Sequence, residues 1–266
     1  MPAHSVNEKR QKMKKNICYY GLDEALVKYK DTEYIELLEK WLPNYFNRAL
    51  KTDLYEESFG STSIFHCIKR KTAHVTGIDI SPAVVNNAMF EICKTSIRSY
   101  GNELRINFVV SDIRTTAFKD NSYDLIVSTS TLDHFREIEL ALKELHRILK
   151  DNGVAVLTLH NKHNPFLAFY FFILSIFNNN KSEKNVLYYF PQAKSLLKNA
   201  NFIIIDSAFI VNIFPLTPTA IKILRKIRSN FSSNLINKII FFLRKFGRGR
   251  DRSASAWFIG FLIKKN

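Results

Sequence analysis

The apolar residues of this chain alternate between two spacings from position 23 to position 160. From Asp23 to Tyr45 the spacing is helical, and Pro43 interrupts it. Short apolar runs typical of buried strands follow, and segments with helical spacing separate them. The expected strands are Ala49–Tyr55, His74–Ile80, Leu104–Ser111, Tyr123–Ser128 and Val154–His160. The expected helices are Ser61–Lys69, Val84–Tyr100 and Glu137–Lys150, and Asp151-Asn152-Gly153 predicts a turn.

Strands that alternate with helices are typical of an α/β fold, in which helices cover both faces of a parallel sheet. Two further apolar runs, Phe202–Phe209 and Ala256–Lys264, look like strands that depart from this rhythm. The 266 residues, of which 46% are hydrophobic, are enough for one large domain or one domain with a sizeable insertion.

Cysteine content and apolar run length exclude several classes of protein. The three cysteines, Cys18, Cys67 and Cys93, are far apart, which argues against a disulfide framework and against paired-cysteine zinc sites. Residues 1–16 do not resemble a signal peptide, and the longest apolar run, Phe166–Phe177, is too short to span a bilayer. We therefore expect a cytoplasmic protein.

The positive charge is concentrated in the C-terminal part of the chain. Residues 1–160 contain 22 Lys and Arg against 21 Asp and Glu, whereas residues 161–266 contain 17 against 3. Such asymmetry predicts an anionic partner, either a membrane surface or a nucleic acid. Ala220–Arg228 and Leu235–Phe246 have the pattern of basic amphipathic helices on an anionic surface, although a solvated basic face is the alternative. The membrane surface would be the inner face.

The same patterns divide the chain into regions. We expect a basic flexible tail over residues 1–20 and a single domain over residues 21–266. Within that domain, residues 161–190 contain an apolar stretch after the fifth strand, which either is buried or contacts a membrane. Residues 213–252 are expected to form a basic insertion.

Acidic residues close two of the expected strands, and ligands of a parallel sheet bind at the carboxyl ends of its strands. Asp79 follows Val75–Ile78 and precedes Ser81-Pro82, which is a good helix start. A carboxylate there can accept both hydroxyl groups of a ribose, or it can simply lie at the N-terminus of the next helix. Asp112 closes the third strand in the same way.

Three sequence strings resemble the class I S-adenosylmethionine (SAM)-dependent methyltransferases, specifically the group that methylates small molecules. They are HVTGIDISPAVVNNA, INFVVSDIRTTAFKDNSYDLIVSTSTLDHF and ALKELHRILKDNGVAVLTLHNKHNP, in order from His74 to Pro165. The resemblance implies a Rossmann-like three-layer sandwich with a mainly parallel seven-stranded sheet whose last strand is antiparallel. It also implies SAM as the cofactor and a substrate-side cap at 161–190.

The resemblance assigns roles to six residues around that cofactor. Asp79 would bind the ribose with Ile80 packing on the adenine, and Asp112 would contact the adenine amine with Ile113 beside it. Ser128 and Thr129 fall where the family lines the floor between the methyl group and the acceptor.

The first family motif departs from the usual pattern. The family carries an acid and then a glycine-rich loop after strand one, whereas this chain has LKTDLYEESFG and keeps only Gly60. The usual spacing back from Asp79 places Glu56 at the acid, while a strand over Ala49–Thr52 would place Asp53 there. The string is similar to a variant motif of some bacterial members, in which Asp53 and Glu56 or Glu57 lie near the cofactor.

A general base is needed only where the acceptor must lose a proton. His134 follows the fourth strand on the substrate side and is the candidate, with a packing role as the alternative. His160 and His163 lack a visible third ligand, so we expect no metal site. Motifs for base and amide methylation and for other enzyme classes are missing.

The sequence therefore predicts methyl transfer from SAM to a small, lipophilic acceptor. The rivals are an RNA methyltransferase, which would use the basic C-terminal region for phosphates, and an inactive binding protein with the same fold. Nucleic acid is the less favoured partner, and the sequence predicts no particular oligomeric state.

Overall fold

The structure is a computed structural model that describes the chain in several ranges. These are residues 24–96, 105–135, 137–165, 167, 169, 186–213, 217, 221, 223, 229–246 and 253–266. The expected basic tail at 1–20 and much of the expected cap at 161–190 lie outside them.

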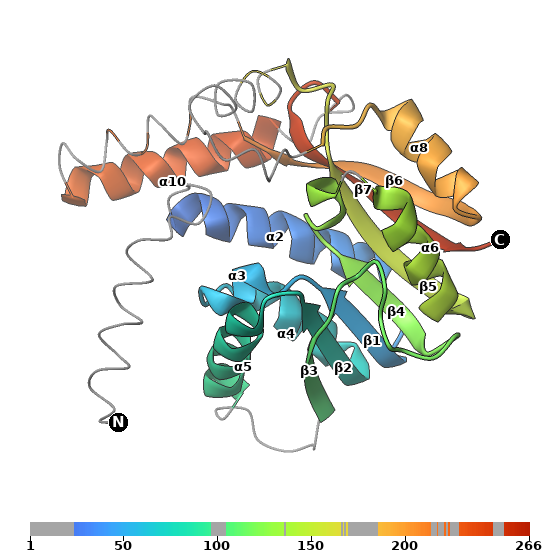
Figure 1. Ribbon diagram of the computed structural model, residues 1–266. Helices are drawn as coiled ribbons and strands as arrows, with labels where there is room; N and C mark the ends of the chain where they lie inside the picture. The colour runs from blue at the N-terminus through green and yellow to red at the C-terminus, as the bar shows by residue number, and fades with distance from the viewer. Residues whose placement is uncertain are drawn as a thin grey trace, which may run out of the picture.

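Helices and strands alternate through these residues as the apolar pattern predicts (Figure 1). The strands are β1 (Phe46–Thr52), β2 (Thr72–Asp79), β3 (Arg105–Val110), β4 (Tyr123–Ser128), β5 (Leu149–His160), β6 (Phe202–Asn212) and β7 (Ala256–Lys265). The helices are α2 (Glu24–Trp41), α3 (Tyr55–Ser58), α4 (Ser63–Arg70), α5 (Pro82–Ser96), the 3-10 helix η2 (Leu132–His134), α6 (Ile138–Ile148), α8 (Phe190–Asn199) and α10 (Ser229–Phe246).

The seven strands form one sheet in the order β3-β2-β1-β4-β5-β7-β6. Strands β1 to β5 pair in parallel, and β7 is antiparallel to both β5 and β6. The order reverses direction between β1 and β4, which is the switch point where ligands of such sheets bind. The predicted fold class is confirmed.

Each face of the sheet has its own apolar core, because successive strand residues point to opposite sides. Ala49 of β1 packs on the face covered by α2, α4, α5 and part of α10, whereas Leu50 packs on the face covered by α6 and α8. Figure 1 shows these two helical layers on either side of the sheet. This arrangement is the three-layer sandwich that the sequence predicts.

Several predicted boundaries differ from the structure, and two of the differences have a visible cause. The first strand ends at Thr52, not Tyr55, because Asp53 has a left-handed backbone (φ 63°) that a strand cannot continue through, and α3 follows. The predicted turn Asp151-Asn152-Gly153 lies inside β5, where an irregularity between the pairs Tyr123–Leu149 and Leu125–Val154 takes up the extra residues.

Helix α10 lies in the predicted basic insertion and overlaps the predicted helix Leu235–Phe246. Ile236 is buried, and Ile239 and Ile240 pack against the same core as α2. Phe241 and Phe242 point outward with 70% and 62% of their surface exposed. No helix within the described residues is long and apolar enough to cross a membrane.

Candidate cofactor and acceptor site

Four neighbouring strands end at the same edge of the sheet. Thr52 at the end of β1 pairs with Ile78 of β2 and with Ser128 at the end of β4, and Asp79 pairs with Val110 at the end of β3. The residues that follow these strands therefore gather at one edge. They include every cofactor residue that the sequence predicts (Asp53, Glu56, Gly60, Asp79, Ile80, Asp112, Ile113, Ser128 and Thr129).

Asp79 connects the end of β2 to the first loop. One carboxylate oxygen accepts a hydrogen bond from the backbone N–H of Leu54 (3.1 Å), and the other accepts one from that of Ser81 (2.9 Å). A carboxylate has about four acceptor positions, so two or so remain for a ligand. The next side chain, Ile80, is 62% exposed. The acid thus has acceptor capacity to spare, and its apolar neighbour is open to solvent.

The first loop contains a buried ion pair in place of a glycine-rich turn. Lys51 on β1 and Glu57 on α3 are 2% and 0% exposed, and the Lys51 ammonium donates to the Glu57 carboxylate at 3.1 Å and to the Asp53 carbonyl at 2.5 Å. Burial raises the pKa of Glu57 to about 7 and that of Asp53 to about 6. Burial alone would lower the pKa of Lys51, but the neighbouring carboxylates raise it, so the ammonium stays charged.

Helix α2 contacts the same loop from the side. Lys30 forms an ion pair with Glu56, and the hydroxyl of Ser61 donates to Asp31. Burial raises the pKa of Asp31. Gly60 has a left-handed backbone (φ 94°), and a Cβ there would meet only Glu91 at 3.6 Å. Glycine is favoured at this position by its backbone conformation rather than by crowding.

Asp112 follows β3 at the same edge but is engaged by its own neighbour. The Arg114 guanidinium donates to both carboxylate oxygens of Asp112 at 2.6–3.1 Å, and these hydrogen bonds lower the pKa of Asp112. Ile113 is buried in the core on the α6 face. The adenine contacts of Asp112 and Ile113 stay a prediction. Arg114 already occupies both oxygens of the Asp112 carboxylate.

Hydroxyl side chains cluster where β1 and β4 end. Thr52 donates to Ser128 at 2.8 Å and lies 3.2 Å from the hydroxyl of Thr131, while Thr129 is 6% exposed. The phenol of Tyr34 on α2 contacts Ser130 at 3.0 Å, and burial raises its pKa so that it stays protonated. The role of Ser128 and Thr129 as a floor between the methyl group and the acceptor stays a prediction.

His134 ends η2 and is half-buried. Its neighbour Asp133 is fully buried, and its carboxylate contacts Nδ1 of His160, the last residue of β5. Burial and the Lys30 ammonium lower the pKa of His160, so its ring is neutral and can donate Nδ1–H to the carboxylate. Sequence reasoning missed this pair, because 27 positions separate two residues that the adjacent ends of β4 and β5 bring together.

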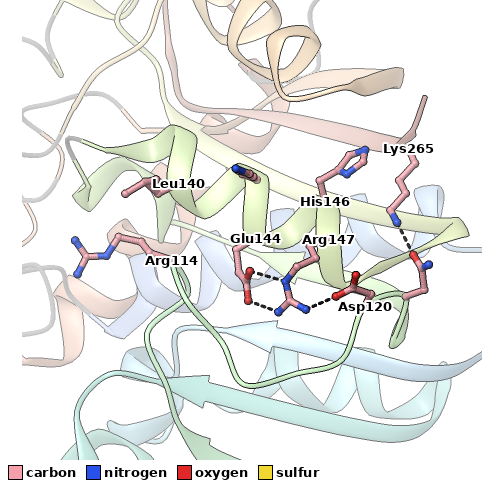
Figure 2. Close-up of a pocket in the computed structure, with 9 residues that line it drawn as sticks. Arg114, Asp120, Leu140, Glu144, His146, Arg147 and Lys265 are labelled. Carbon is pink, nitrogen blue, oxygen red and sulfur yellow. Dashed lines mark hydrogen bonds and ion pairs between the residues drawn. The ribbon is translucent and has the colours of Figure 1, made fainter.

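A cavity of about 420 Å³ lies elsewhere, along α6 (Figure 2). There Arg147 donates to Glu144 and to Asp120, and Lys265 lines one side. Asp120 lies just before β4 and Lys265 ends the antiparallel β7, so this cavity reaches the opposite edge of the sheet. It shares no residue with the predicted cofactor site.

The residues at the carboxyl edge fit a nucleoside cofactor with a cationic amino-acid part. Asp79 keeps free acceptor capacity, Ile80 offers an exposed apolar surface, and two buried carboxylates, Asp31 and Glu57, each have an oxygen without a hydrogen-bond partner. Such acceptors suit a positively charged group of the cofactor.

Comparison with known proteins supports this fit. Residues 58–157 match the family model described as a methyltransferase domain. A 98-residue segment is 26% identical to demethylmenaquinone methyltransferase from Bacteroides fragilis, and a 94-residue segment is 31% identical to 2-phytyl-1,4-naphtoquinone methyltransferase from Nostoc sp.. These segments cover 37% and 35% of the chain and only 38% and 39% of the relatives' lengths.

Solved structures extend the likeness of fold to most of the chain. Geranyl diphosphate C-methyltransferase from Streptomyces coelicolor A3(2), whose structure contains S-adenosyl-L-homocysteine (SAH), matches with a TM-score of 0.57 and 12% identity over 88% of this chain and 79% of that one. The [4+2]-cyclase SpnF matches equally well, with a TM-score of 0.57 and 15% identity over 88% of this chain and 80% of that one. The predicted resemblance to class I SAM-dependent methyltransferases is confirmed, because residues 58–157 match the model of a methyltransferase domain and the fold is shared with solved methyltransferase structures.

Proposed function

We propose that this chain is a SAM-dependent methyltransferase that acts on a small, lipophilic acceptor. The observation that carries the proposal is the pair Asp79 and Ile80, a carboxylate with spare acceptor capacity beside an exposed apolar side chain at the switch point of the sheet. A methyltransferase domain surrounds it in the sequence. SAM would supply a methyl group on a positively charged sulfur.

Different residues of the chain would bind different parts of the cofactor. Asp79 would accept the ribose hydroxyls and Ile80 would pack on the adenine, while Asp112 and Ile113 would flank the base. Asp53, Glu56 and Gly60 belong to the loop that would hold the amino-acid part of the cofactor. Ser128 and Thr129 would line the floor toward the acceptor. Because methyl transfer is an in-line displacement, most of the rate enhancement would come from this positioning.

An acceptor that must lose a proton would need a general base, and His134 and His160 are the two histidines considered. His134 is the base that the sequence predicts. His160 would be a poor base, because burial lowers its pKa to about 3. A lipophilic quinol-type acceptor would need a general base, and quinone methyltransferases are among the relatives.

An anionic membrane surface is part of the proposal, because a lipophilic acceptor resides in a bilayer. Residues 161–266 carry a net charge of +14, and α10 exposes Phe241 and Phe242 beside the exposed Lys238. Apolar side chains that insert below a basic helix face are typical of peripheral membrane helices. We therefore propose that α10 lies on the membrane.

Calorimetry with SAM and SAH, followed by transfer from radiolabelled SAM to a short-chain 1,4-naphthohydroquinone, tests the proposal. Micromolar binding and labelled product would support it. Binding without transfer to any quinol, or preferential labelling of RNA, would favour one of the rivals. A chain that binds neither SAM nor SAH would refute it.

A further inference from the structure

The first loop collects more acidic than basic side chains. Five carboxylates and two ammonium groups meet there, which leaves three negative charges when all are ionised. The carboxylates belong to Asp31, Asp53, Glu56, Glu57 and Asp79, and the ammonium groups belong to Lys30 and Lys51. The Glu56 charge acts on Asp31, Asp53 and Glu57, and the Asp79 charge acts on Asp53. These groups therefore form one electrostatic unit, which we call the acidic cluster.

Two oxygens of the acidic cluster have no hydrogen-bond partner in the part of the chain that the structure describes. They are Oδ1 of Asp31 and Oε1 of Glu57, on side chains whose residues are 6% and 0% exposed. Buried carboxylate oxygens nearly always find a donor, because leaving one unpaired costs the full desolvation of the group. Within the described ranges, no three acidic, histidine or cysteine side chains come together as a metal site. The two oxygens point to an organic cation.

Both ammonium groups of the acidic cluster already have carboxylate partners. Lys30 pairs with Glu56, and Lys51 donates to Glu57 Oε2 and to the Asp53 carbonyl. Ser61 donates to the other oxygen of Asp31. Among the described residues, the remaining acceptors have no donor.

We propose that the acidic cluster selects ligands by their positive charge, so that SAM binds more tightly than SAH. The inference rests on the proposed function and adds a selectivity to it. SAM carries one more positive charge than SAH, because the sulfur is a sulfonium in the first and a neutral thioether in the second. An excess of negative charge in a buried site stabilises the charged ligand, whereas the uncharged thioether gains nothing from it.

The selectivity would favour turnover as well as binding. The two ligands share the adenosine and amino-acid parts, so the contacts of Asp79 and Ile80 are common to both. Only the electrostatic contribution distinguishes them, and it disappears once the methyl group has left. The acidic cluster therefore promotes exchange of product for fresh cofactor.

Isothermal titration calorimetry of the full chain with SAM and with SAH tests the proposal. At pH 8 we expect wild type to bind SAM about tenfold more tightly than SAH, on the order of a single charge interaction in a partly screened site. Asp31→Asn keeps the shape of the side chain and an acceptor for Ser61 but removes one charge. It should reduce the ratio of the two dissociation constants about three- to tenfold.

The matched control is Glu39→Gln on the same helix. Glu39 pairs with Lys71 and Arg70 away from the acidic cluster. This variant changes the net charge by the same amount and should leave the SAM-to-SAH ratio unchanged. Glu56→Gln provides a second cluster variant if Asp31→Asn does not fold, and thermal unfolding of each variant reports folding.

A second measurement uses pH. The pKa values of about 7 for Glu57 and about 6 for Asp53 mean that both carboxyls gain protons as the pH falls from 8 to 5.5. Asp31, whose pKa is also raised, Glu56, Asp79, Lys30 and Lys51 complete the set of charged groups that face them. A cation favours the ionised carboxylates, so SAM binding should release protons near pH 6.5, and the preference for SAM should shrink toward pH 5.5. Titrations in two buffers of different ionisation enthalpy measure that release.

Equal affinity of wild type for SAM and SAH at pH 8 would overturn the proposal while leaving the proposed function intact. So would an Asp31→Asn variant that weakens both ligands by the same factor. Failure of wild type to bind either ligand would instead remove the proposed function and this inference with it.

Discussion

Asp79 combines a structural role with the position that we propose for ribose binding. Its carboxylate accepts backbone hydrogen bonds from Leu54 and Ser81, which ties the first loop and the start of α5 to the end of β2. The two interpretations weighed from the sequence, a ribose acceptor and a charge near a helix start, are therefore compatible. The same geometry that fixes the loop holds the carboxylate at the carboxyl edge of the sheet.

Asp79→Ala is expected to lower the affinity for SAM at least tenfold. Two charge-assisted hydrogen bonds to the ribose would be lost, each contributing about 1.5–3 kcal/mol. The matched control is Asp124→Ala, because Asp124 also accepts a backbone N–H, that of Arg48 at 2.9 Å, but lies near the start of β4. Calorimetry should show an unchanged SAM affinity for the control. Equal losses in both variants would mean that Asp79 acts only through folding.

At the level of single residues, the sequence predicted positions that depend on neighbouring residues and missed contacts between distant segments. Asp79 could be placed at a strand end from Val75–Ile78 before it and Ser81-Pro82 after it, because these signals are contiguous. The Asp133–His160 pair and the contact of Lys30 with Glu56 could not, since each joins distant segments through packing. The ion pair between Asp112 and Arg114 was also not predicted, although the two residues are only two positions apart.

At the level of elements, α10 is the helix whose exposed surface is least explained by packing. Its buried side carries Ile236, while Phe241 and Phe242 project outward on the same helix. Exposed aromatic pairs on a basic helix are typical of membrane-contacting surfaces.

We expect Phe241→Ser/Phe242→Ser to lose most of its binding to anionic vesicles without a loss of folding stability. Both side chains are mostly exposed, so their removal costs little apolar burial, whereas insertion into a bilayer would be lost. Vesicle sedimentation and thermal unfolding measure the two effects. Tyr45→Ser, which removes a 65% exposed aromatic residue next to β1, is the control and should bind vesicles as wild type does. Undiminished vesicle binding by the double variant would rule α10 out as the contact.

The sheet itself could be predicted well, because strands buried on both faces give contiguous apolar runs. Tyr123–Ser128 has the predicted limits, whereas β1 ends three residues early at the left-handed Asp53. Helix α8 was not predicted at all. Its sequence FPQAKSLLKN is short, and Ala193 and Leu197 make up its buried part.

At the level of the whole molecule, charge is distributed unevenly along the chain. The excess of +14 in residues 161–266 contrasts with near neutrality in residues 1–160, which contain the methyltransferase domain match. Association with an anionic surface would therefore be separable from cofactor binding.

Binding to anionic vesicles should be strong at 0.1 M salt and largely reversed at 1 M, because the Debye length falls from about 10 Å to about 3 Å. Neutral vesicles should bind weakly at both salt concentrations, and SAM affinity should change little between them. Sedimentation with vesicles and with a structured RNA at equal salt makes the comparison. Tighter binding to RNA, or equal binding to neutral vesicles, would contradict the membrane proposal.

Strand β7 has a consequence for how the molecule is made. It follows the other six strands in the chain, yet it lies between β5 and β6 and pairs with both. Until residues 256–265 leave the ribosome, β5 and β6 each present an open edge to the cell's other nascent chains. Translation speed over the basic segment before β7, and a chaperone that shields those edges, would set the yield of native protein.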